Sequence, residues 1–187
     1  KYTKIEYWFD YKGTHLIYDH NDIKSLEKKL IEATEIIKAT NGGILVITEG
    51  VFSMSGEQGK IIEICDLKKS YEFRLLVDDA HGFGVMGQNG NGIVCSKNLE
   101  HEVDLYFTTF TKSMVSFGAI IAGKKEIINY FKYNLRSQIF SKSLPMPIVY
   151  GLNERLKIVK NADENRKKLF ETTHYLHDGL KERNLLN

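Results

Sequence analysis

The stretch that decides the fold is LLVDDAHGFGVMG, residues 75–87. Three apolar residues lead directly into two aspartates, and a histidine and three glycines follow. An apolar run of this kind is typical of a strand that is buried on both faces of a parallel sheet. In such sheets, ligands bind beyond the carboxyl ends of the strands. We therefore expect the polar residues from Asp78 onward to line a binding site.

Similar apolar runs lie on either side of this stretch in the sequence. Residues 44–48 (ILVIT) precede it and residues 104–108 (DLYFT) follow it, at the spacing of strand–helix–strand units. A fourth run, residues 118–123 (GAIIAG), begins only nine residues after the third. Because a parallel crossover needs about a dozen residues or more, we expect the last pair to be antiparallel. The predicted fold class is α/β, a mostly parallel sheet with one antiparallel strand and helices on both faces.

Helical periodicity occupies the segments between and after these runs. Apolar residues from Ile23 to Ile37 repeat at spacings of three and four, which is one face of a helix. Asn21 or Asp22 can cap its start, because a short side-chain oxygen accepts hydrogen bonds from the free amides of the first turn. Further helices are predicted over residues 60–72, over 127–135, from Pro147 onward and over 163–183.

The composition is that of a globular protein. The 187 residues are 42% hydrophobic and 27% charged, with a net charge of +2, which excludes a disordered or a disulfide-stapled chain. Basic residues occur as scattered pairs, so no nucleic-acid partner is expected. No apolar run is long enough to span a membrane. The two cysteines, Cys65 and Cys95, lack metal-site spacing, and free thiols favour a cytoplasmic location.

Aromatic residues are frequent in the first 18 positions and predict irregular structure or an edge strand there (Tyr2, Tyr7, Trp8, Phe9, Tyr11, Tyr18).

Polar side chains follow each of the first three predicted strands. TEGVFSMSGE (48–57) follows the first and TTFTKSMVSFG (108–118) follows the third. Together with residues 78–81 these segments bring a carboxylate, an imidazole, hydroxyls and one lysine, Lys112, to one edge of the sheet. The sequence therefore predicts that these groups converge.

Three other chemistries use only parts of this set. Residues 82–87 match GxGxxG, but the following QNGNG cannot sustain the helix that a dinucleotide-binding loop opens. Gly59-Lys60 and Gly123-Lys124 lack the Ser or Thr of a phosphate-binding loop. Asp78 and His81 lack a third and fourth ligand of clear spacing, so no metal site is predicted.

Pyridoxal phosphate (PLP) can use the whole set. Its aldehyde needs a lysine amine, for which Lys112 is placed. Its pyridine nitrogen needs a carboxylate that keeps it protonated, and Asp78 can serve. His81 and Ser53 can contact the ring oxygen, and Thr109 can hold the phosphate. A buried aspartate is costly unless a positive charge offsets it, and a pyridinium is such a charge.

These motifs resemble a known family. TEGVFSM (48–54), VDDAHGFGVMG (77–87) and TFTKS (109–113) are similar to the α-oxoamine synthases, PLP enzymes of the aspartate-aminotransferase fold (fold type I). DHNDIKSLEKKL (19–30) and the SLP of residues 143–145 extend the resemblance, which runs from about residue 19 to about residue 159.

The resemblance implies an enzyme that condenses an amino acid with an acyl-CoA, usually with loss of carbon dioxide. Lys112, His81 and Asp78 would be catalytic, and Ser53 and Thr109 would help to bind the cofactor. Lys112 would hold the cofactor as a Schiff base and then act as the base for the α-proton. The role of Glu49 stays open.

The resemblance also implies a homodimer with shared active sites. Residues 1–150 would belong to the PLP-binding large domain, and residues 151–187 would lead towards the small domain. The chain would correspond to about the middle of such an enzyme. Serine palmitoyltransferase-like or 8-amino-7-oxononanoate synthase-like activity is favoured. Glycine C-acetyltransferase activity and a non-catalytic subunit remain alternatives, although retention of the lysine argues against the latter.

Two positions depart from the family pattern. Val115 and Ser116 stand where the family usually has glycine soon after the lysine, and a bulkier loop can alter substrate access. Lys142 stands where relatives often have a small or hydroxyl residue. Its role stays open.

Overall fold

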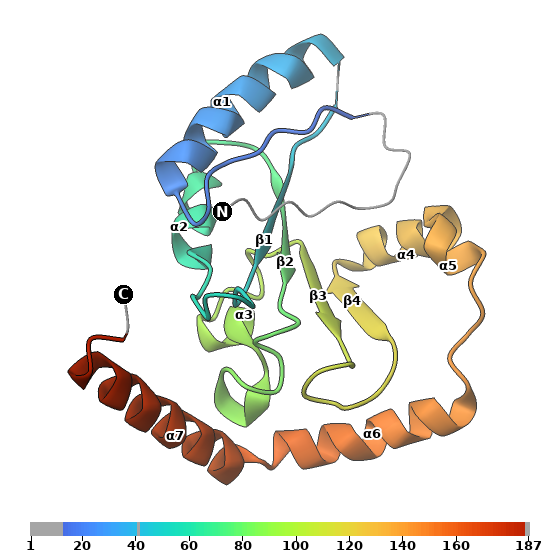
Figure 1. The fold of residues 1–187 in the computed structure, drawn as a ribbon. Coiled ribbons are helices and arrows are strands. Elements are labelled where there is room, and N and C mark those ends of the chain that lie inside the picture. Colours follow the sequence, from blue (N-terminus) through green and yellow to red (C-terminus); the bar gives the residue numbers. More distant parts are fainter. Residues whose placement is uncertain (1–12, 41, 186–187) are drawn as a thin grey trace.

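The protein is described by a computed structural model that covers residues 13–40 and 42–185. Four strands form one sheet in the order β1-β2-β3-β4: β1 (Leu45–Glu49), β2 (Arg74–Asp78), β3 (Leu105–Thr109) and β4 (Ala119–Gly123) (Figure 1). The first three strands are parallel and β4 is antiparallel to β3. The predicted mixed sheet and its one antiparallel pair are therefore confirmed.

Helices surround this sheet (Figure 1). They are α1 (Ile23–Thr40), α2 (Ile61–Leu67), α3 (Ile93–Ser96), α4 (Lys125–Asn134), α5 (Arg136–Ile139), α6 (Met146–Lys160) and α7 (Asp163–Glu182), with a 3₁₀ turn, η1, at Gln88–Gly90. The prediction of a helix over residues 60–72 is too long, because the chain turns after Leu67 to enter β2. Asp22 begins α1, since its Oδ1 accepts the backbone N–H groups of Lys24 and Ser25 at 2.9 and 3.1 Å.

The core lies where α1, α2 and α3 pack against the sheet. Alternate residues of the strands point into it, as the period of two requires. Leu75 and Val77 are fully buried, and Leu30 of α1 and Ile93 of α3 are 2% and 0% exposed. The other buried apolar members include Leu26, Val46, Ile61, Ile64, Phe73, Val94 and Val103.

A buried arginine joins the C-terminal helices to the loop after β2. Arg166 of α7 is 7% exposed. Its Nη1 donates to the carbonyls of Val159 at 2.7 Å and Gly84 at 3.3 Å, and its Nη2 pairs with Asp163 Oδ1 at 2.7 Å. A buried guanidinium is stable only when its donors are paired, as here. Arg166 therefore links α6 and α7 to the glycine-rich part of residues 75–87, a link that the sequence did not predict.

Most of the aromatic N-terminal stretch lies outside the described residues. Residues 13–18 form no strand, so the irregular alternative holds for that part. Tyr18 packs against the core, and its hydroxyl donates to the Ile47 carbonyl at 3.1 Å. Within the described ranges, no helix is both long and apolar enough to cross a membrane.

Candidate active site

The carboxyl ends of β1, β2 and β3 meet at one edge of the sheet. The strand register pairs Glu49 with Asp78, and Asp78 with Phe107. Residues paired in register project to the same side of the sheet. Glu49 and Asp78 therefore lie side by side as the last residues of neighbouring strands. Thr109 ends β3, and Lys112 follows it in the turn to β4.

Three of the predicted residues influence one another electrostatically. Partial burial lowers the pKa of His81, the positive charge of Lys112 lowers it further, and Asp78 opposes both effects. The lowered pKa favours the neutral form of His81 at pH 7, in which one ring nitrogen is a donor and the other an acceptor. The Lys112 side chain is exposed. The fold thus places an amine, a carboxylate and a neutral imidazole in one electrostatic neighbourhood.

Glu49 belongs to the same neighbourhood. Its burial raises the pKa of the carboxyl group, and the adjacent Asp78 raises it too. A hydrogen bond from the Ser53 backbone N–H lowers this pKa, as do the charges of Lys112 and His20. The sequence left the role of Glu49 open, and the register is what places it beside Asp78.

The two consecutive aspartates have different surroundings. Asp78 Oδ1 accepts the Ala80 N–H at 3.0 Å, so a tight turn orients this carboxylate at the strand end. In the described part of the chain no cation forms an ion pair with it. Asp79 is fully buried, and its Oδ2 accepts the Ile93 N–H at 2.8 Å and the Tyr106 hydroxyl at 2.9 Å. Burial raises the pKa of Asp79 to about 6. These contacts give Asp79 a structural role in holding α3 and β3 to the end of β2.

The turn that carries Lys112 packs against the glycine-rich loop. Gly84 has φ +83°, and a Cβ there would lie 2.5 Å from the Ser113 Cβ. The Val115 N–H donates to the Lys112 carbonyl at 3.0 Å and closes the turn. Val115 itself has φ +44°, a left-handed conformation that is unusual for a β-branched residue. A glycine, which the resemblance to the α-oxoamine synthases implies in this region, would adopt this conformation without strain.

The hydroxyl residues lie at the edges of this arrangement. Thr109 Oγ1 lies 3.0 Å from Thr111 Oγ1, at the end of β3. Ser53 is exposed on the loop between β1 and α2. Its hydroxyl makes no hydrogen bond to the other predicted residues within the described ranges. The structure therefore brings the loop that carries Ser53 to the predicted site residues at the strand ends. The Ser53 hydroxyl itself does not contact them.

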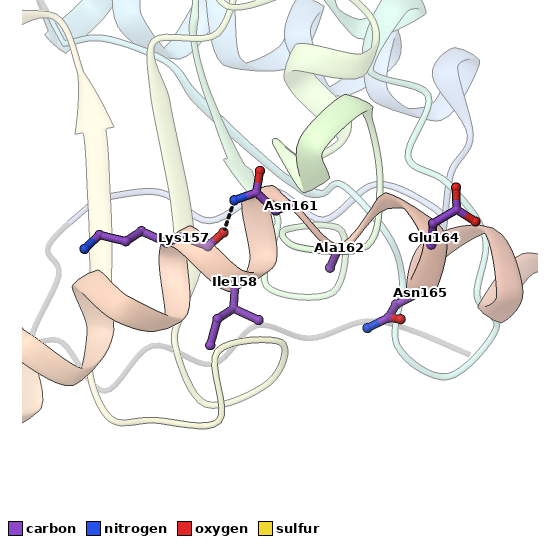
Figure 2. Close-up of a pocket in the computed structure, with 6 residues that line it drawn as sticks. All are labelled: Lys157, Ile158, Asn161, Ala162, Glu164 and Asn165. Carbon is purple, nitrogen blue, oxygen red and sulfur yellow. Dashed lines mark hydrogen bonds between the residues drawn. The ribbon is translucent and has the colours of Figure 1, made fainter.

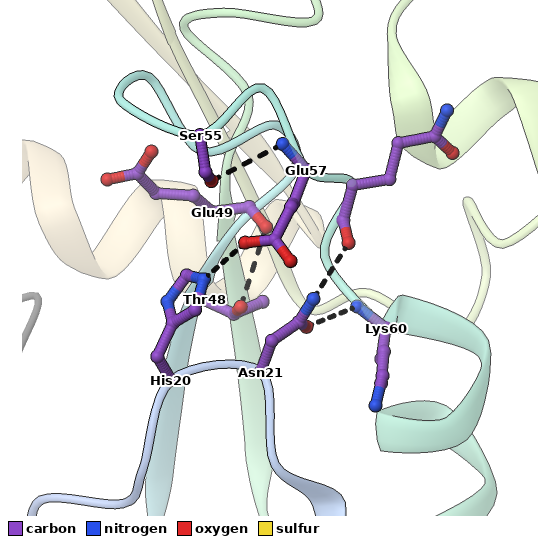
Figure 3. A network of polar contacts seen from close by, with 8 residues as sticks. His20, Asn21, Thr48, Glu49, Ser55, Glu57 and Lys60 are labelled. Atoms are coloured by element: carbon purple, nitrogen blue, oxygen red, sulfur yellow. Dashed lines mark hydrogen bonds and ion pairs between the residues drawn. The ribbon is translucent and has the colours of Figure 1, made fainter. Parts of the chain in front are cut away.

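Two further residues hold this loop, and no pattern in the sequence indicates that they do so. His20 and Asn21 precede α1 and contact residues 57–60 (Figure 3). From the sequence, Asn21 is only a candidate helix cap. No local signal could have revealed these contacts, because they join segments almost forty residues apart.

A hollow of about 430 Å³ lies at the junction of α6 and α7 (Figure 2). Its walls are Lys157, Ile158, Asn161, Ala162, Glu164 and Asn165. None of the predicted site residues lines it, so it is separate from the strand-end arrangement.

Comparison with known proteins identifies the family. The family model described as aminotransferase class I and II matches residues 6–186. The chain belongs to this family. It is 52% identical over 171 residues to a cysteate-C-fatty acyltransferase of Capnocytophaga ochracea, a match covering 91% of this chain and 41% of the relative. It is 39% identical over 170 residues to an 8-amino-7-oxononanoate synthase of Fervidobacterium nodosum, covering 91% and 42%.

Solved structures of serine palmitoyltransferase have the same fold. Serine palmitoyltransferase from S. paucimobilis, with a bound PLP–myriocin aldimine, aligns with a TM-score of 0.80 at 29% identity, covering 88% of this chain and 42% of that one. The resemblance to the α-oxoamine synthases and the type I fold are thereby confirmed. The chain spans about two-fifths of the length of the curated relatives it matches.

Proposed function

We propose that the chain is part of a PLP-dependent acyltransferase that condenses an amino acid with an acyl-CoA thioester. The observation that carries this proposal is the electrostatic grouping of Lys112, Asp78 and His81 at the ends of neighbouring strands. An exposed amine beside a carboxylate and a neutral imidazole suits covalent carbonyl chemistry. The names of the relatives support the acyl-transfer part of the proposal.

The residues present fit this cofactor. Asp78 and Glu49 lie side by side, and burial together with the negative charge of Asp78 raises the pKa of Glu49. A protonated pyridine nitrogen next to Asp78 would offset this excess negative charge. The hydroxyls of Thr109 and Thr111 at the end of β3 are donors suited to a phosphate. Amine, carboxylate and hydroxyl donors therefore occur in the combination that PLP requires.

Bound PLP supplies an electron sink that stabilises negative charge on the α-carbon of an amino acid. Asp78 would hold the proton of the ring nitrogen, and its turn hydrogen bond with Ala80 orients it for that task. His81, being neutral, would donate an N–H to the ring oxygen without adding positive charge, and Ser53 would contact the same oxygen. The Lys112 Nζ would first hold the cofactor and then take the proton from the α-carbon of the substrate.

For the substrates, we propose a small amino acid and a fatty acyl thioester. Cysteate-C-fatty acyltransferase at 52% identity is among the relatives, and serine palmitoyltransferases are among the solved structures of the same fold. Both names pair a polar C3 amino acid with a long acyl chain. Alanine with pimeloyl-CoA, as in an 8-amino-7-oxononanoate synthase-like reaction, and glycine with acetyl-CoA are the competing pairs.

The test uses the complete natural protein. It is incubated with PLP, reduced with borohydride and mapped by peptide mass spectrometry. We expect a pyridoxyl label on the peptide that contains Lys112, and loss of that label in Lys112→Ala. The matched control is Lys125→Ala, an exposed lysine at the start of α4. No label on the complete protein would refute the proposal in favour of a non-catalytic subunit.

A second assay identifies the substrates. Cysteate, serine, alanine and glycine are each supplied with palmitoyl-, pimeloyl- and acetyl-CoA, and release of free CoA is measured. Palmitoyl-CoA with cysteate or serine is expected to give the largest rate. A largest rate with glycine and acetyl-CoA would contradict the substrate assignment while leaving the reaction class intact.

We further propose that the complete protein is a cytoplasmic homodimer with shared active sites. The two cysteines of this chain are free, which supports a reducing compartment. Large apolar side chains are exposed, among them Phe117 at 68% and Phe140 at 79%, and a partner subunit would cover them. Residues 1–150 would belong to the large domain and 151–187 would lead towards the small domain. Light scattering of the complete protein tests the dimer, and a monomeric mass at working concentration would contradict it.

A further inference from the structure

Two residues just before α1 reach across to the loop between β1 and α2 (Figure 3). Asn21 Nδ2 donates to the Gln58 carbonyl at 3.1 Å, and Asn21 Oδ1 accepts the Lys60 N–H at 3.1 Å. His20 Nε2 lies 2.8 Å from Glu57 Oε2. The loop is thus held from outside by two consecutive side chains.

The chemistry at position 21 is specific to asparagine. A side-chain amide donates and accepts at once, whereas an ionised carboxylate only accepts. The backbone of Asn21 has φ +54°, a left-handed conformation that asparagine tolerates better than most residues. Asp22 performs the helix-capping task, because its Oδ1 accepts the N–H groups of Lys24 and Ser25. Asn21 is therefore not needed as a cap, and its two hydrogen bonds serve the loop.

The contacts of Asn21 hold the base of a small hairpin. Val51 and Gln58 form an antiparallel bridge, and the Gly59 N–H donates to the Gly50 carbonyl at 2.9 Å. Gly59 also packs so closely on the Glu49 carbonyl that a Cβ there would clash. Fixing residues 58 and 60 therefore fixes Gly59 against the end of β1, and with it the start of the hairpin.

The contacts of His20 hold the side of the same hairpin. Besides the Glu57 contact, its ring meets the Phe52 ring edge-on with centroids 4.4 Å apart. Phe52 and Glu57 face each other in the hairpin, since the Phe52 N–H donates to the Glu57 carbonyl at 2.9 Å. Ser53 comes directly after Phe52.

We propose that Asn21, assisted by His20, is a positioning residue that holds Ser53 at the cofactor site by clamping the 50–60 loop to β1. This inference rests on the proposed function, because the contact of Ser53 with the cofactor is itself proposed. Neither His20 nor Asn21 touches the cofactor or the substrate in this scheme.

The test uses the complete protein with Asn21→Leu, Asn21→Asp, His20→Phe and Ser53→Ala. Lys28→Gln, at an exposed position of α1, is the matched control. In the cofactor-free protein, hydrogen exchange of residues 51–59 is expected to accelerate about tenfold or more in Asn21→Leu, since two hydrogen bonds are lost. Asn21→Asp keeps the bond from Lys60, so its acceleration should be smaller. His20→Phe keeps the ring packing and tests the Glu57 contact alone.

Cofactor affinity, measured by absorbance titration, then tests the link to Ser53. Asn21→Leu and Ser53→Ala are each expected to weaken PLP binding about tenfold, and the double variant no more than Ser53→Ala alone. Additive losses would overturn the proposal, as would unchanged exchange of residues 51–59. If Asn21→Leu does not fold, Asn21→Asp takes its place in the cycle. Failure of the unmodified protein to bind PLP would refute the proposed function and the role of Ser53, while the exchange measurement would still report separately on the clamp.

Discussion

A buried carboxylate at the far end of the sheet offers a sharp test of what holds this fold together. Asp104 lies directly before β3 and is 8% exposed. Its Oδ2 accepts Lys68 Nζ at 2.6 Å and the Leu75 N–H at 2.8 Å. It therefore ties the segment after α2 and the strand β2 to the start of β3. The perturbation is Asp104→Ala.

The magnitude follows from what the substitution leaves behind. The Leu75 N–H would be buried without an acceptor, and the Lys68 ammonium, 19% exposed, would lose its counter-ion. Breaking a buried ion pair in this way costs about 3–5 kcal/mol. Arg74 is 3.5 Å away and 62% exposed, so its contribution is small. Lys68 also donates to the Glu102 carbonyl, which favours the lower end of this range.

The assay is denaturant unfolding of the complete protein and of three variants. Asp104→Ala is expected to lower the free energy of unfolding by about 3 kcal/mol. Asp104→Asn keeps an acceptor for the Leu75 N–H and should lose about 1–2 kcal/mol. The control Asp66→Asn breaks an exposed pair with Lys69 and should change it by less than about 1 kcal/mol.

The pH dependence supplies an independent check. Burial alone would raise the pKa of Asp104, but hydrogen bonds from Lys68 and the Leu75 N–H, with the charges of Lys68 and Arg74, lower it overall. A carboxyl whose pKa is lower in the folded state stabilises the protein above its unfolded pKa of about 4. The difference between the unmodified protein and Asp104→Asn should therefore be constant from pH 7 to 5 and shrink below about pH 4. Equal stability of Asp104→Ala and the Asp66→Asn control would refute the reasoning.

Three further predictions concern the site and the core. Lys112→Ala should raise the pKa of His81, because the positive charge of the lysine lowers this pKa. The pKa is measured by NMR titration of the imidazole, and a fall or no change would contradict the prediction. Gly84→Ala should reduce borohydride labelling of Lys112, since φ at position 84 is +83° and the new methyl group would displace Ser113, the neighbour of Lys112; full labelling would contradict this. Cys65 is buried and its pKa is raised to about 11, so at pH 8 a thiol reagent should label it only on unfolding.

The fold was largely predictable from the sequence because its signals are local. The apolar runs that predicted β1 to β4 begin and end within about one residue of the strands, and the short connection from β3 to β4 correctly indicated the antiparallel pair. Helix ends were less predictable. The prediction over residues 60–72 included the mainly polar residues 68–72, but α2 ends at Leu67 because the chain must turn to enter β2. Chain reversal depends on where the next strand lies, which periodicity does not contain.

For the candidate site, the sequence indicated which residues come together better than it indicated how they are arranged. Asp78, His81 and Lys112 follow strands that are neighbours in the sheet, and their mutual influence agrees with the expected convergence. Ser53 differs, because its hydroxyl does not contact the others and its position depends on a loop. The pairing of Glu49 with Asp78 also needed the register, since either residue could be shifted by one position along its strand and face the other side.

By itself the sequence determined where the strands lie along the chain, which pair is antiparallel and which residues follow the strands, because run length and connection length act over a few residues. Only the tertiary structure decided which distant segments meet there. The clamp of Asn21 on residues 58 and 60, the link from Arg166 to Gly84 and the ion pair of Asp104 with Lys68 each join residues more than thirty positions apart. Such contacts arise only when packing of the core brings separate elements into register, and no local pattern records them.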